Sequence, residues 1–87
     1  MDVVVTAIEY EWNASNRGGK RVVSKTIRLP VMPRNGDYLE LDLPGGPLSV
    51  MVGEVRIGES RLSIQISLTD VTELVNDGWE AVSGGER

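Results

Sequence analysis

The segment RLSIQISLT, residues 61–69, decides the fold class because aliphatic and polar residues alternate in it without a break. Leucine or isoleucine stands at positions 62, 64, 66 and 68, and every position between them is polar. Successive side chains of a β-strand point to opposite faces, so the pattern predicts a strand with one buried and one exposed face. YLELDL, residues 38–43, repeats it with leucines inward and acids outward. The chain is therefore predicted to be mainly β.

Upstream of these strands, two apolar segments flank a polar loop at residues 13–19 that contains Asn, Ser and a Gly-Gly pair. Such residues turn the chain because they tolerate positive φ or bond their own backbone. The two segments are therefore predicted to form a long hairpin. Its apolar faces consist of Val4, Ile8, Tyr10 and Trp12 on the first strand and of Val23, Ile27, Leu29 and Val31 on the second.

A fourth strand is predicted over about residues 48–57, where the alternation is less regular. Gly53 interrupts it, and a glycine inside a strand pattern indicates a bulge. A tight turn then leads to the last strand. A two-residue loop would set two arginines opposite each other, which is unfavourable. A four-residue loop, which pairs Ile57 with Leu62, is therefore favoured.

The period of the apolar residues changes at VTELV, residues 71–75, where they recur at the three- and four-residue spacing of a helix. Asp70 precedes this segment and Glu73 follows three residues later, which is the arrangement of a capping box. A helix of about two turns is predicted to start at Asp70.

The helix is predicted to end at Gly78, because glycine adopts the left-handed conformation that stops a helix. Trp79 and Val82 then fold back as apolar anchors. The tail at residues 83–87 is predicted to be disordered. These boundaries define one domain, residues 1–82, as expected for a chain of 87 residues.

Five strands joined by short loops predict an antiparallel meander that curls into a small barrel, with one short C-terminal helix covering one end or face. The chain resembles small bacterial SH3-like β-barrel proteins of uncharacterised function in the order of its elements. These are a hairpin, the segment PRNGD at residues 33–37, a meander and a short helix ending in Gly78-Trp79. The resemblance covers residues 20–82. It implies architecture but no activity, and it transfers no functional residue.

The composition excludes most enzyme classes. The chain has neither Cys nor His, so it can form no disulfide, thiolate nucleophile, imidazole base or Cys/His zinc site. The acids Asp37, Glu40, Asp42 and Glu54 could form a carboxylate or oxygen-ligand metal site, but acids at alternate strand positions are interpreted as a solvated face. We expect a non-enzymatic protein without cofactor or metal. It has no basic leader and no apolar run of membrane-spanning length, so a cytoplasmic location is expected.

A strip of uncharged residues is the main candidate for binding a partner. It is predicted to lie on the outward face of the last two strands and to consist of Val50, Val52, Ser63, Gln65, Ser67 and Thr69. A surface of this kind can dock a protein, either another copy or a different chain. The alternative is that the C-terminal helix covers the strip with Val71, Leu74 and Val75.

The distribution of charge suggests a second function. The net charge is −4, but residues 12–36 contain six basic residues and no acid, which leaves +6 there and −10 elsewhere. A basic hairpin can bind nucleic acid through its phosphates. The residues that would do so are Trp12, Arg17, Lys20, Arg21 and Arg28. The competing interpretation is that these cations pair with carboxylates such as Glu9, Glu11, Glu40 and Asp42 on flanking strands.

Overall fold

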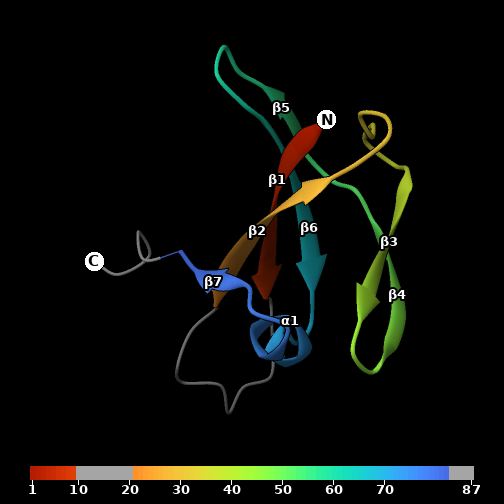
Figure 1. Cartoon of the computed structure of the whole chain (residues 1–87), viewed down its shortest axis with the longest axis vertical. Coiled ribbons are helices and arrows are strands. Elements are labelled where there is room, and N and C mark those ends of the chain that lie inside the picture. The colour runs from red at the N-terminus through yellow and green to blue at the C-terminus, as the bar shows by residue number, and fades with distance from the viewer. Residues whose placement is uncertain (10–20, 83–87) are drawn as a thin grey trace.

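The computed structural model describes residues 1–9 and 21–82, and it shows a mainly β chain with one short helix (Figure 1). In chain order the elements are β1 (Asp2–Glu9), β2 (Val22–Arg28), β3 (Tyr38–Leu43), β4 (Gly46–Met51), β5 (Val55–Ile57), β6 (Leu62–Leu68), α1 (Thr72–Asn76) and β7 (Glu80–Ala81). A five-stranded sheet has the order β5-β6-β1-β2-β7, and β3 and β4 form a separate two-stranded sheet.

The prediction of an antiparallel meander closed into a barrel is wrong. β1 lies in the middle of the larger sheet, antiparallel to β2 as predicted but parallel to β6, with Val5 opposite Ile64. β3 pairs with β4 and not with β2, so the two sheets do not close around the core. The run Val3–Val5 is apolar at consecutive positions, although only Val3 and Val5 are buried and Val4 is half-buried on the opposite face.

The two sheets are joined at Gly53, where the predicted fourth strand divides into β4 and β5. The N–H of Gly53 donates to the carbonyl of Gln65 at 2.8 Å, and the N–H of Gln65 donates to the carbonyl of Glu54 at 2.9 Å. Gly53 and Glu54 thus both lie opposite Gln65, which confirms the predicted bulge. A Cβ at position 53 would lie 3.2 Å from the carbonyl oxygen of Gln65, so the close approach favours glycine. Beyond the bulge, Ile57 pairs with Leu62 and confirms the four-residue loop.

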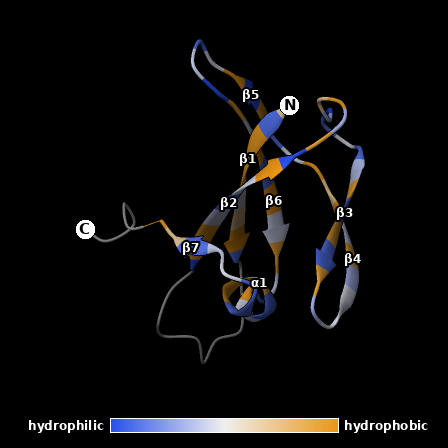
Figure 2. Cartoon of the chain, viewed as in Figure 1, coloured by the Kyte–Doolittle hydropathy of each residue, from blue (hydrophilic) through white to orange (hydrophobic). Residues whose placement is uncertain are grey.

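The core lies between the two sheets and is closed at one end by α1. Its members include Val3, Val5, Ala7, Leu39, Leu41, Leu43, Ile64, Ile66, Val71, Leu74 and Trp79. The leucines of β3 and the isoleucines of β6 face inward, as the alternation of these segments predicted, and Figure 2 shows hydrophobic and hydrophilic colours alternating along the strands.

The predicted apolar faces of the first two strands need correction. In β1 the odd positions from Val3 to Glu9 are buried, whereas Val4 and Ile8 are only half-buried. In the second segment Val23 is buried, but β2 ends at Arg28 and Val31 beyond it is exposed. Tyr10, Trp12 and the predicted loop at 13–19 lie outside the described residues.

The helix begins later than predicted and without a capping box. Its N-cap is Val71, and the carboxylate of Asp70 accepts a hydrogen bond from the N–H of Thr72, only two residues on, at 2.9 Å. The predicted stop is confirmed, since Gly78 has a φ of 97°.

The residues after the helix show how its end is fixed. The N–H of Trp79 donates to the carbonyl of Leu74 at 3.1 Å, a bond typical of a glycine-terminated helix. Trp79 is buried and anchors the helix as predicted. Val82 is not an apolar anchor, because its side chain is 41 % exposed and its N–H instead donates to the carbonyl of Val22.

Candidate functional site

Two of the six residues of the predicted docking strip, both valines, do not lie on the surface. Val50 and Val52 are 5 % and 1 % exposed and lie in the core, so their predicted outward orientation is wrong. The reason is the bulge at Gly53, which inserts one residue and reverses the alternation between β4 and β5. Before the bulge the even-numbered residues Val50 and Val52 point inward, whereas after it the odd-numbered residue Val55 does.

The remaining part of the strip belongs to a wider surface, which we call the outer face. Ser63 and Gln65 are half-buried, and Ser67 is exposed. All three lie beside even-numbered residues of β1. These residues of β1 lie in turn beside even-numbered residues of β2. Thr69 is exposed just beyond the end of β6. The outer face consists of Val4, Thr6, Ile8, Val22, Ser24, Thr26, Ser63, Gln65 and Ser67. It therefore spans three adjacent strands.

The helix does not cover the outer face. Val71 and Leu74 are buried in the same core cluster as Ile64 and Ile66, which occupy the opposite face of β6. Val75 is 41 % exposed. The alternative in which α1 buries the strip is therefore wrong.

Ion pairs and a shallow hollow border the outer face. Arg28 lies 3.6 Å from Asp2 at one end of β1 and β2, and Arg56 lies 3.1 Å from Glu54 beside β6. A hollow of about 200 Å³ next to Gln65 is lined partly by the second pair. The border thus carries both signs of charge around an uncharged centre.

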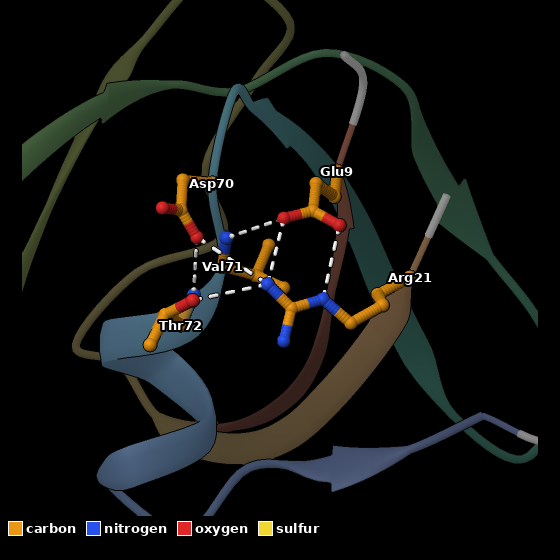
Figure 3. A network of polar contacts seen from close by, with 5 residues as sticks. All are labelled: Glu9, Arg21, Asp70, Val71 and Thr72. Carbon is orange, nitrogen blue, oxygen red and sulfur yellow. Dashed lines mark hydrogen bonds and ion pairs between the residues drawn. The ribbon is translucent and has the colours of Figure 1, made fainter. Parts of the chain in front are cut away.

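A buried acid ties the far ends of β1 and β2 to the start of α1 (Figure 3). Glu9 accepts hydrogen bonds from Arg21 Nε at 3.0 Å and Nη2 at 2.9 Å, and a third from the N–H of Val71 at 3.3 Å. Arg21 Nη2 also donates to Thr72 Oγ1 at 3.0 Å and lies 3.4 Å from Asp70 Oδ1. We call these five residues the polar node. It connects three elements through one guanidinium group.

The electrostatics of the polar node favour ionised carboxylates. The hydrogen bonds from the Arg21 side chain lower the pKa of Glu9, and the N–H of Val71 adds to this effect against the opposing influence of burial. Hydrogen bonds from Thr72 lower the pKa of Asp70. The burial of Glu9 was not predicted from the sequence. Every odd-numbered residue of β1 from Val3 onward points inward, and this alternation was the signal that could have predicted the burial of Glu9.

The described cations of the proposed nucleic-acid surface have carboxylate partners. Arg21 pairs with Glu9, as the competing interpretation predicted, and Arg28 pairs with Asp2. Glu40 and Asp42 do not flank β2, because β3 belongs to the other sheet. The residues Trp12, Arg17, Lys20 and Glu11 lie outside the described residues. Of the predicted set the structure describes only Arg21 and Arg28, and these lie at opposite ends of β2, so it does not bring them together.

The described residues include no metal-binding cluster and no membrane-spanning helix. Within residues 1–9 and 21–82, no cluster of three acids could hold a metal ion. The single helix of that part of the chain is far too short to cross a bilayer.

The chain was also compared with known proteins. No family model matches it, and neither the curated proteins nor the solved structures include a match. The resemblance to SH3-like proteins stays a prediction.

Proposed function

We propose that this protein is a non-enzymatic self-association module in which the outer faces of two copies pack against each other. The observation that carries the proposal is a patch of nine neighbouring uncharged residues on one sheet face, in a chain of which 25 % of residues are charged. Charged residues of the same face, among them Arg56 beside Ser63 and Glu80 beside Ser24, lie at its border. Charged residues are depleted at the centres of protein interfaces, where burying an unpaired charge is costly.

A second copy suits this face for electrostatic reasons. Each copy carries a net charge of −4, which opposes association, so the contact surface itself should add no further like-charge pairs. The outer face is such a surface. Around a two-fold axis the same patch contacts itself, and a border that contains both Arg28 and Asp2 can place opposite charges across the interface.

The geometry indicates a weak dimer. The side chains are small hydroxyl, amide and aliphatic groups, so two sheets can approach to about 10 Å. Three strands about 4.8 Å apart give a footprint that is small compared with the ~800 Å² per partner of a typical stable interface. We expect a dissociation constant in roughly the micromolar to millimolar range.

Sedimentation velocity over about 5 to 500 µM protein tests the proposal across that range. Gln65→Lys places a charge midway along the β6 side of the outer face, next to Thr6, and should abolish the dimer, because each copy would then bury a charge in the interface. Ser49→Lys is the matched control, since it adds the same charge at an exposed position of β4 in the other sheet. A wild-type protein that remains monomeric throughout would refute self-association, and a dimer insensitive to Gln65→Lys would place the interface elsewhere.

A further inference from the structure

A cavity of about 410 Å³ lies between the two sheets, on the side where β2 faces β3. Its walls are residues 25–29 and residues 40–43, with Asp77 and Trp79 completing the lining. β7 pairs only with Val23 and Ser24, so within the described part of the chain the rest of β2 has no strand on this side. The cavity therefore occupies the position that another strand would take.

The free edge of β2 presents the backbone of Thr26 and Arg28 to this cavity. Met1 and Leu29 exchange two hydrogen bonds of 2.8 Å, so the odd-numbered residues of β2 direct their backbone groups toward β1. Residues of an antiparallel strand alternate in this respect. The N–H and C=O groups of Thr26 and Arg28 consequently point away from β1.

The free edge of β3 presents the backbone of Glu40 and Asp42 from the opposite wall. The N–H of Val52 donates to the carbonyl of Asp37 at 2.8 Å, which assigns the odd-numbered residues of β3 to the pairing with β4. By the same alternation, Glu40 and Asp42 direct their backbone groups away from β4. Donors and acceptors at strand spacing thus line both walls.

A buried side-chain donor lies in the same cavity. Trp79 is only 5 % exposed, and its Nε1 has no hydrogen-bond partner among the described residues. Buried polar groups of folded proteins are almost always hydrogen-bonded, so an indole N–H without a partner calls for an acceptor from elsewhere. Trp79 lines the cavity, but its Nε1 is not accessible from it in the unbound structure, so the indole ring must shift before a ligand can supply that acceptor.

We propose that this cavity binds an extended peptide segment of a partner protein, which adds as a strand between β2 and β3. A peptide backbone carries alternating donors and acceptors on both sides and so matches both walls, which a compact small molecule does not. Residues 25–29 and 40–43 correspond to a length of roughly 13 to 17 Å, or four to five peptide residues. Once the indole ring has shifted, one peptide carbonyl accepts the Trp79 N–H.

The peptide side chains follow from the lining. Alternate side chains of an added strand point toward the core, where they meet Ile27, Leu41 and Leu43, so we expect aliphatic residues at those positions. The bound strand would join the two sheets where they are now separate. This site shares only Thr26 with the outer face, through its backbone rather than its side chain, and does not depend on self-association.

Selection from a phage-displayed random heptapeptide library tests the proposal with the full chain as bait. The tightest peptide is then synthesised and titrated into ¹⁵N-labelled protein. We expect chemical-shift changes at the amides of Thr26, Arg28 and Asp42 and at the indole N–H of Trp79. Enrichment of no peptide, or shift changes confined to outer-face residues other than Thr26, would overturn the proposal.

Glu40→Pro isolates the role of the β3 edge. Proline removes an N–H that points into the cavity and takes no part in the ladder with β4, so the fold should tolerate it. Peptide affinity should fall about tenfold, because one backbone hydrogen bond is lost and the ring obstructs the edge. Glu40→Gln, which changes the charge but keeps the N–H, is the control and should bind within about twofold. Equal affinity of the proline variant and its control would contradict strand addition.

A second pair of measurements separates binding from folding and from self-association. Replacement of Trp79 by 3-benzothienylalanine, in which sulfur takes the place of the indole N–H, should weaken peptide binding without lowering the thermal stability of the free protein. A loss of stability with unchanged affinity would assign Trp79 a purely structural role. The Gln65→Lys variant should bind the peptide normally even though it no longer dimerises, so the two proposals can fail independently.

Discussion

Replacing Glu9 with glutamine tests how strongly the polar node stabilises the fold. The carboxylate accepts two hydrogen bonds from Arg21 and one from the N–H of Val71. Glutamine retains one acceptor and turns an NH2 donor toward groups that also donate. Hydrogen bonds to charged groups contribute about 1.5–3 kcal/mol each. The Arg21 side chain is 49 % exposed, so solvent screens part of this, and we expect Glu9→Gln to cost about 2 kcal/mol in all.

Urea denaturation and thermal unfolding followed by circular dichroism measure this loss. For a domain of this size, 1 kcal/mol lowers Tm by about 4–8 °C, so the expected decrease is roughly 8–16 °C. Glu73→Gln is the matched control, because it removes the same charge from an exposed position of α1 and should change stability by less than about 0.5 kcal/mol. If Glu9→Gln also fell within that range, the node would not stabilise the fold and the reasoning would be refuted.

The dependence on pH gives an independent check. The pKa of Glu9 is lower in the folded protein than its ordinary value of 4.5. The ionised carboxylate therefore contributes stability that is fully present above the unfolded pKa and is lost as the pH falls through the folded pKa. The difference in stability between the wild-type protein and Glu9→Gln should be constant near pH 7 and shrink below about pH 4.5. A difference that does not change with pH would show that the charge of Glu9 is not responsible.

Two further predictions concern the bulge and the basic hairpin. Gly53→Ala should destabilise the protein by about 1 kcal/mol in urea denaturation, because its Cβ would lie 3.2 Å from a ladder carbonyl. Gly45→Ala is the control, since its Cβ would make an ordinary 3.7 Å contact with Glu73, and equal effects would argue against a steric role of Gly53. In a tryptophan fluorescence titration with short DNA and RNA at about 50 and 200 mM salt, we expect no saturable binding, because Arg21 and Arg28 are paired. Saturable binding lost at the higher salt would instead identify the basic hairpin as the functional site.

Local features of this fold could be predicted because they depend on residues near one another in sequence. The alternation in β3 and β6 gives their inward faces directly, and Gly78 ends the helix through its own backbone freedom. The pairing of Ile57 with Leu62 followed from loop length and charge. Each of these involves at most a dozen residues of chain.

The arrangement of the strands could not be predicted in the same way. Alternation states which face of a strand is buried but not which strand lies beside it, so nothing in β1 distinguishes a parallel neighbour from an antiparallel one. The position of Val52 was missed because the phase of alternation was carried across the bulge at Gly53. The cavity lined by Trp79 was missed as well, since it exists only because β2 and β3 do not pair.

The parallel pairing of β1 with β6 has a consequence for the order of events when the chain folds. Val3 lies opposite Leu62, so this contact closes a loop of about 60 residues, whereas β3 and β4 are joined by a two-residue turn. Contacts between distant residues form slowly because the chain entropy is lost before the strands pair. During synthesis β1 leaves the ribosome ahead of the other strands, yet it must wait for residue 68 before the centre of the sheet can assemble. Until then the valines of β1 remain exposed to solvent and to neighbouring chains.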